Sequence, residues 1–307
     1  MRFEDQPFII LDGACGTNLQ LMDIPDSAWE GRDGCNELLN VTAPELIEGL
    51  HRQFFDAGAM AVETNTFGAS RVVLAEYDLA DQVTAINQAA VAAARRAAGG
   101  EPDRYVVGSI GPTTKLLSLG HITRDELVDN YREQVTALLE AGVDALIIET
   151  CQDLAQVKTA LITCFEAREK TGVDVPVMVS LTIEQTGTML VGSDIAAACA
   201  ALEPFPVFSL GLNCATGPEE MESHLRFLSQ NWPRRISCVP NQGLPEVVNG
   251  QTCYRLEPDA YAAKMRHMVD RFGVSVVGGC CGTTPEHIRR LVEAVRGVRV
   301  PTREVTA

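Results

Sequence analysis

The chain has 307 residues, a formal net charge of −16 and 46% hydrophobic residues. Its acidic balance argues against nucleic acids and anionic membrane surfaces as partners, and no apolar run reaches the ~18 residues of a membrane helix. The N-terminus MRFEDQPFII has neither the basic segment nor the cleavage site of a signal peptide, so we expect a cytoplasmic protein.

Eight short apolar runs recur along the chain, each ending in a small, polar or glycine-bearing turn. They are FIILDGACG (8–16), AMAVETNTF (59–67), YVVGSIGPT (105–113), ALIIETCQD (145–153), VPVMVSLT (175–182), VFSLGLNC (207–214), ISCVPNQG (236–243) and VSVVGGCCG (274–282). These runs lack strict polar–apolar alternation, which is typical of strands buried on both faces in a parallel sheet. Amphipathic helical patterns lie between them, at 43–58, 124–142, 154–172 and 258–273.

This alternation predicts an α/β protein with a single (β/α)8 TIM barrel. No linker or composition break divides the chain, so we expect one domain over 1–307 with its core at about 8–297. Two longer segments interrupt the rhythm, at 14–42 and 112–123, and such loops after strands often build or cover an active site.

Chemistry in TIM barrels takes place at the carboxyl ends of the strands, which we call the mouth. Polar and metal-binding residues stand at every predicted strand end: Asp12, Glu63, Ser109, Glu149, Thr182, Cys214, Asn241, Cys280 and Cys281. We therefore expect these side chains to converge, with Glu63 and Ser109 as pocket walls or as partners of the local backbone.

Three cysteines at two of these strand ends allow four interpretations. Three thiolates with an open fourth position form a reactive zinc site, whereas a lone cysteine is often only a small buried hydrophobe. Adjacent cysteines rarely bridge each other, because their Cα atoms are only ~3.8 Å apart. The stretch GGCCGTTPEHI also has the pattern of a glycine loop before a helix, with Thr284 as N-cap, where barrels often bind phosphate.

A zinc site with three cysteinates favours thiol chemistry over hydrolysis. Its formal charge is negative, which makes it a poor Lewis acid for water. A free thiol with a pKa near ~8.5 is only a few per cent ionised at neutral pH, and coordination removes that limit. The predicted site would therefore hold a substrate sulfur as an electron-rich thiolate suited to attack an alkyl group.

Eight motifs carry a resemblance to a known family: DGACGTNLQ, GCNELL, ETNTFGAS, GSIGPT, IIET, GLNCATG, PNQGLP and VVGGCCGTTPEHI. In their order and spacing they resemble the homocysteine S-methyltransferase family, and most closely its cobalamin-dependent methionine synthase branch. The resemblance covers about 8–297. It implies a zinc barrel that binds homocysteine and presents its thiolate to a methyl donor, giving methionine.

The resemblance also implies roles for single residues. It implies a Zn2+ site through which catalysis occurs, with an exchangeable ligand in the last of its four positions: Cys214, Cys280, Cys281 and Asn241. It further implies that Asp12 and Glu149 receive the substrate amino group and that the amide of Gly13 binds its carboxylate. An ammonium group does favour carboxylates, and a carboxylate favours backbone N–H donors.

The methyl donor stays open between several compounds. Betaine-using relatives carry tyrosines after the second and fourth strands, where this chain has Gly68 and Thr150, so we expect no betaine cage. The resemblance favours methylcobalamin, and S-methylmethionine is the alternative. The chain contains no folate or cobalamin domain, so we expect it to work with a corrinoid-binding domain or subunit, either as an excised module or as a free-standing subunit. A non-catalytic zinc- or thiol-binding subunit and a phosphate-binding barrel enzyme are the other readings.

Overall fold

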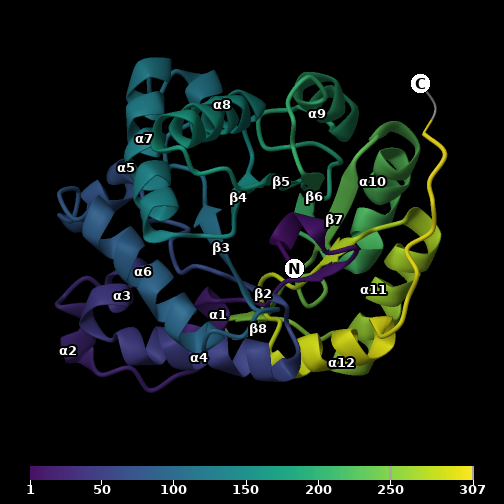
Figure 1. Ribbon diagram of the computed structural model, residues 1–307, viewed down its shortest axis with the longest axis horizontal. Coiled ribbons are helices and arrows are strands. Elements are labelled where there is room, and N and C mark those ends of the chain that lie inside the picture. Colours follow the sequence, from purple (N-terminus) through teal and green to yellow (C-terminus); the bar gives the residue numbers. More distant parts are fainter. Residues whose placement is uncertain (249–250, 306–307) are drawn as a thin grey trace.

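Eight parallel strands form a ring in the computed structural model, which describes residues 1–248 and 251–305 (Figure 1). The strands are β1 (Ile9–Ile10), β2 (Ala61–Glu63), β3 (Tyr105–Ile110), β4 (Ala145–Cys151), β5 (Val177–Leu181), β6 (Ser209–Asn213), β7 (Arg235–Val239) and β10 (Val276–Val277). Their order is β1-β10-β7-β6-β5-β4-β3-β2. A bridge between Leu11 and Ala61 joins the two ends. The predicted (β/α)8 TIM barrel is confirmed.

Helices surround the ring and connect successive strands (Figure 1). The longer ones are α4 (Pro44–Ala57), α6 (Val83–Ala98), α7 (Arg124–Ala141), α8 (Leu154–Thr171), α9 (Ile195–Leu202), α10 (Pro218–Asn231), α11 (Pro258–Phe272) and α12 (Pro285–Val295). Local sequence sets their ends. Thr123 and Glu126 form a capping box at the start of α7, and Gly142 takes the left-handed conformation after its last turn.

Short helices lie in the segments that follow the first two strands. They are α1 (Gly16–Leu19), α2 (Asp26–Trp29), α3 (Leu39–Thr42) and α5 (Arg71–Leu74). Buried amides tie the first loop to the second: Asn40 Nδ2 donates to the carbonyl of Asn65 at 2.7 Å, and Asn65 Nδ2 donates to that of Asn36 at 2.8 Å. Both loops therefore stand together at the mouth.

The barrel interior is apolar and closed at the amino ends of the strands. Phe3 is buried there, with its ring 5.5 Å from that of Tyr105 and 5.7 Å from that of Phe208. Gln6 donates to the Tyr105 hydroxyl at 2.7 Å. The N-terminus lies over the middle of the ring in Figure 1. Polar side chains inside the barrel can therefore meet solvent only at the mouth.

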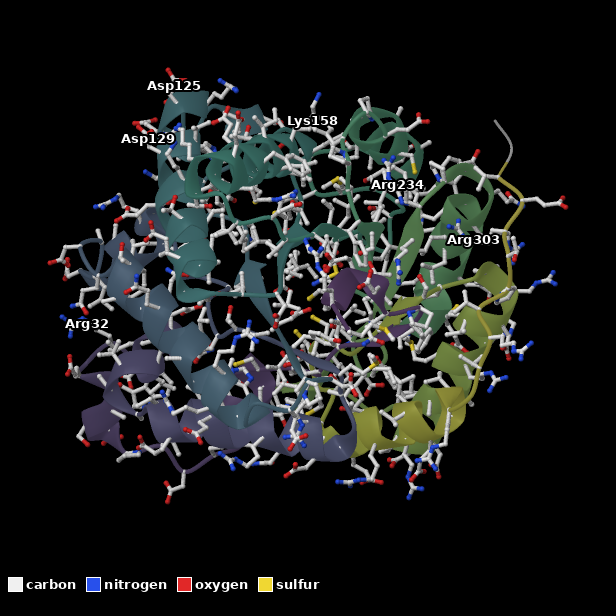
Figure 2. The ribbon with its side chains drawn as sticks, viewed as in Figure 1. Arg32, Asp125, Asp129, Lys158, Arg234 and Arg303 are labelled. Carbon is white, nitrogen blue, oxygen red and sulfur yellow. The ribbon has the colours of Figure 1, made fainter. Side chains whose placement is uncertain are left out.

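Charged side chains project outward from the helices, as Asp125, Asp129 and Lys158 do in Figure 2. Arg303 binds the C-terminal segment back to the barrel, since its guanidinium donates to the carbonyl oxygen of Trp232 at 2.8 Å. Among the described residues, no helix is long and apolar enough to cross a membrane.

The structure differs from the sequence prediction at one loop. A hairpin of β8 (Glu246–Val248) and β9 (Gln251–Cys253) follows β7, where no element was predicted. The sequence EVVNGQTC does carry an Asn-Gly pair between β-forming residues, which is the pattern typical of a hairpin.

Candidate metal centre and substrate pocket

The three predicted cysteines meet at the mouth. The Sγ atoms of Cys214, Cys280 and Cys281 all lie within 4.8 Å of one another, and those of Cys214 and Cys281 are 3.8 Å apart. Hydrogen bonds with Cys214 and Cys280 lower the pKa of the Cys281 thiol, and those with Cys214 and Cys281 raise the pKa of Cys280. A cluster of soft sulfur donors at this spacing is suited to zinc.

Backbone geometry fixes where these sulfurs lie. Cys214 directly follows β6 and has φ of +60°, a left-handed conformation that is rare for a residue with a side chain. Cys280 N donates to the carbonyl of Pro240 at 2.8 Å, and Thr283 Oγ1 donates to the carbonyl of Cys280 at 2.6 Å. A side chain at Gly279 would overlap Thr283, so glycine is required there. The loop after β10, which carries Cys280 and Cys281, is thus held between the loops after β1 and β7.

The start of α12 is arranged differently from an anion site. Thr284 N donates to Nδ1 of His287 at 3.3 Å, and the two side chains meet at 2.9 Å. The amide that a phosphate would use is therefore occupied by a side chain from the same helix. This weakens the phosphate interpretation of GGCCGTTPEHI.

Asn241 offers an oxygen beside the cysteines. It is only 2% exposed, and its Oδ1 has no hydrogen-bond partner among the described residues. Its backbone N donates to the carbonyl of Thr216 at 3.1 Å, and the next residue, Gln242, donates from its N to the carbonyl of Cys281 at 2.9 Å. A buried amide oxygen without a partner costs free energy, so it fits a fourth metal ligand better than a structural role.

Carboxyl groups from three strands converge beside this cluster. Asp12 is 5% exposed, and both of its oxygens accept from Glu63 N at 3.2 Å. Glu149 is 9% exposed and accepts from Ser109 Oγ at 2.5 Å. Burial raises the pKa of all three carboxyls, and the proximity of Glu149 raises that of Glu63 further. Within the described chain no basic side chain forms an ion pair with them. The group is therefore suited to a cationic ligand such as an ammonium.

Gly13 lies next to Asp12 and packs tightly. A Cβ there would come within 2.8 Å of both Phe54 and Thr283, so no side chain fits. No acceptor for its backbone N–H is found in the described part of the chain. That amide, next to Asp12 in the chain, is therefore free to donate to a ligand.

The sequence profile of the family described as homocysteine S-methyltransferase matches residues 9–295. The chain belongs to this family. It is therefore a homocysteine S-methyltransferase domain, and the resemblance inferred from its motifs is confirmed.

The sequences of curated relatives agree with that family, and a solved structure shares the fold. Methionine synthase from Mycobacterium tuberculosis is 47% identical over 305 residues, covering 98% of this chain, and that from Mycobacterium leprae is 47% identical over 294 residues, covering 94%. The chain spans only 26% and 24% of their lengths. The homocysteine methyltransferase MmuM from Escherichia coli, in its oxidized form, superposes with a TM-score of 0.75 at 24% identity, covering 94% of this chain and 97% of that one. At this identity the likeness shows a shared fold.

Glu63 was predicted at the mouth of this methyltransferase domain as a pocket wall or as a partner of the local backbone. Its carboxyl lies against Glu149, and its backbone N binds Asp12. It is therefore a third member of the carboxyl cluster. The only sequence signal was its place, since it is the last residue of β2.

Replacing Glu63 by glutamine is expected to stabilise the homocysteine-free domain at neutral pH. The folded-state pKa of Glu63 is raised, so its contribution to stability is full below the unfolded pKa of ~4.3 and is lost as the pH rises through the folded value. Glutamine has no proton to lose. Thermal unfolding from about pH 5 to about pH 8 should show the variant losing less stability, ending about 3 °C above wild type. Parallel pH profiles would contradict this. Glu140→Gln, an exposed change on α7, is the control.

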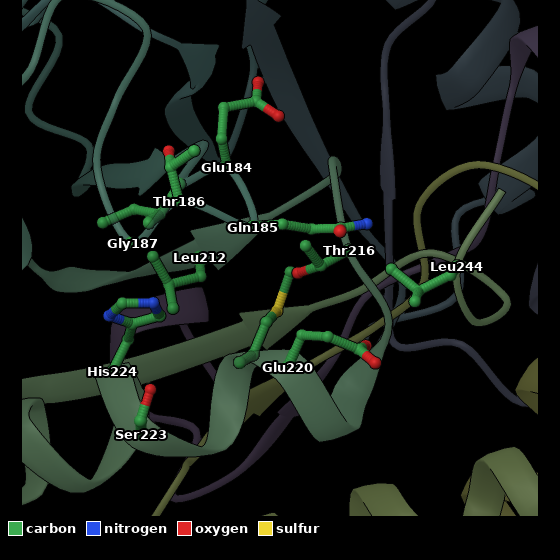
Figure 3. A pocket seen from close by; sticks show the side chains of 12 residues that line it. Glu184, Gln185, Thr186, Gly187, Leu212, Thr216, Glu220, Ser223, His224 and Leu244 are labelled. Atoms are coloured by element: carbon green, nitrogen blue, oxygen red, sulfur yellow. The ribbon is translucent and has the colours of Figure 1, made fainter.

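A cavity of about 400 Å³ has no cysteine in its lining (Figure 3). It lies between the loop after β5, the helix α10 and the loop after β7, and was not predicted. Thr216, two residues after Cys214, and His224 on α10 both line it. No histidine of the described chain joins the cysteine cluster.

Proposed function

We propose that this barrel, with its core at 8–297 as one domain, binds homocysteine and transfers a methyl group to its sulfur, giving methionine. The observation that carries the proposal is the meeting of three thiols within 4.8 Å of one another, beside buried carboxyl groups that have no cationic partner in the described part of the chain. A thiol site next to an ammonium site suits an amino acid with a terminal thiol.

Zn2+ would be held by Cys214, Cys280 and Cys281, with Asn241 in an exchangeable fourth position. When bound there, zinc supplies an electron-rich substrate thiolate at neutral pH. The unpaired Oδ1 of Asn241 supports its assignment. Because Asn241 carries no charge, it can give way to an anionic sulfur at little electrostatic cost.

The chain's own residues orient the other end of the substrate. Asp12 and Glu149 would accept hydrogen bonds from the ammonium group, and the free amide of Gly13 would donate to the carboxylate. In the transfer itself, a sulfur lone pair forms the new S–C bond. The bond between the methyl group and its carrier breaks, and its electron pair stays with the carrier. No general base is needed at that step.

We propose methylcobalamin, carried by another domain or subunit, as the donor. The positions that carry betaine-binding tyrosines in relatives do not suit tyrosine here. A Cβ at Gly68 would lie 2.8 Å from Oε1 of Glu37, and the side chain of Thr150 is engaged by Asn213 at 2.6 Å. The packing at these two positions supports a donor other than betaine.

Exposed apolar side chains support a protein partner at the mouth. Seven of the eight large exposed hydrophobic residues in the described chain lie in the segments that follow strands β1, β2, β3, β5 and β7: Leu21, Val41, Phe67, Leu119, Leu190, Leu244 and Val247. Exposed apolar groups gathered on one face mark interaction sites. We propose that the corrinoid-binding domain or subunit docks on this rim, in the cytoplasm, where ten free thiols are stable.

The proposed function is tested by offering donors to the purified, zinc-loaded domain with homocysteine. Methionine is expected from methylcobalamin and none from betaine, and S-methylmethionine tests the alternative small-donor activity. Replacing Leu21 and Phe67 together by serine should slow transfer from a methyl-corrinoid protein by about tenfold, and leave transfer from free methylcobalamin unchanged, because only the protein needs the rim. Zinc binding without methionine from any donor would favour a non-catalytic zinc- or thiol-binding subunit.

A further inference from the structure

The end of β4 carries an irregularity just where Glu149 enters the mouth. The pairing register between β4 and β5 shifts between Ile148 and Cys151. Thr150 within this bulge has φ of +58°, a left-handed conformation that β-branched residues strongly avoid. Such a conformation persists only where neighbouring groups hold it.

Asn213, the last residue of β6, supplies those contacts. Its Oδ1 accepts from Thr150 N at 3.1 Å, and its Nδ2 donates to Thr150 Oγ1 at 2.6 Å. The backbone of Asn213 is held in turn, since its carbonyl accepts from Thr182 Oγ1 at 3.0 Å. Asn213 is 1% exposed. Because β5 lies between β4 and β6, this amide reaches across one strand to bind the bulge.

The same amide nitrogen faces both halves of the proposed substrate site. Nδ2 lies 3.4 Å from Oε2 of Glu149 and 3.9 Å from Sγ of Cys280. One side chain thus connects a carboxyl proposed for the substrate amino group with a thiol proposed for the metal. The distance between these two ends must match the length of the substrate.

We propose that Asn213 is a positioning residue that holds Thr150 in its left-handed conformation and thereby keeps Glu149 directed at the substrate amino group. This inference rests on the proposed function, because Glu149 must bind that amino group. Because Asn213 acts through Glu149, removing its side chain should weaken the binding of ligands that carry an amino group. The binding of ligands without an amino group should not change.

Isothermal titration of zinc-loaded variants with homocysteine and with 4-mercaptobutyrate, which lacks only the amino group, tests the proposal. Asn213→Ala is expected to raise the dissociation constant of homocysteine about tenfold and that of 4-mercaptobutyrate less than about twofold. Adding Thr150→Gly to the Asn213→Ala variant should restore most of the lost homocysteine affinity, because glycine adopts positive φ without strain. Asn213→Ser, which keeps a polar group, is a milder second variant with the same expected selectivity. Zinc content is measured first for each.

Controls separate this inference from the proposed function. Ser209→Ala removes a buried hydroxyl from the same strand, one without a partner in the described chain, and should change neither constant. The positioning role is wrong if Glu149→Ala weakens homocysteine binding while Asn213→Ala weakens the binding of both ligands equally. It is also wrong if Thr150→Gly restores no homocysteine affinity to the Asn213→Ala variant. If Glu149→Ala leaves homocysteine binding unchanged, the proposed amino-group site is wrong.

Discussion

Replacing Cys281 by serine is expected to abolish both zinc binding and methyl transfer. A serine hydroxyl is a hard, protonated donor at neutral pH and cannot replace a thiolate on zinc. Loss of a residue that merely orients a ligand costs about 10- to 100-fold in metal affinity, so loss of a ligand itself should exceed about 100-fold. Metal analysis after dialysis against a chelator, together with methionine formation from methylcobalamin, measures both effects. Cys214→Ser should behave in the same way.

The control for these variants is Cys253→Ser. Cys253 lies in β9, on the loop after β7, and is not part of the cysteine cluster. This variant should keep one zinc per chain and full activity. A Cys281→Ser protein that methylates homocysteine at the wild-type rate without metal would disprove the proposed mechanism.

The barrel could be predicted because its strands are short, apolar and ended by polar or glycine residues. Once the strands are parallel, all of their carboxyl ends must share one face, so the strand-end cysteines and carboxyls had to meet. The lengths of the strands were harder to predict from the sequence. The apolar runs 8–16 and 274–282 include the turns that end them, and within these runs β1 and β10 have only two residues each. Glycines at 13, 278 and 279 release the chain into loops that carry Asp12, Cys280 and Cys281 to the site.

Other parts of the site depend on backbone conformations that no residue type signals. Thr150 and Cys214 adopt positive φ although neither is glycine, and the contacts of Asn213 exist only because of the bulge in β4. The sequence therefore predicted Glu149 and Cys280 as separate features and gave no sign that one amide contacts both. The contact between Glu63 and Glu149 was equally hidden, because it depends on how side chains turn inside the ring.

Neutralising Asp12 or Glu149, the carboxyls proposed to bind the substrate amino group, is expected to weaken homocysteine binding while leaving the metal in place. Asp12→Asn keeps an oxygen for Glu63 N, and Glu149→Gln keeps one for Ser109, so the fold should be retained. A hydrogen bond to a charged group contributes about 1.5–3 kcal/mol, which predicts a rise in the dissociation constant of about 10- to 100-fold for each variant. Titration of the zinc-loaded proteins with homocysteine measures it.

Asp153→Asn is the matched control for these two variants. Asp153 is also buried and also follows β4, but its carboxyl accepts from Ser118 and from Ala155 N at the start of α8. Homocysteine binding should not change. Asp12 and Glu149 would contact the same ammonium group. The dissociation constant of the double variant should therefore rise by less than the product of the two single-variant fold changes. A rise equal to that product would mean that the two carboxyls contact separate groups. Unchanged homocysteine binding in both single variants would disprove the amino-group assignment.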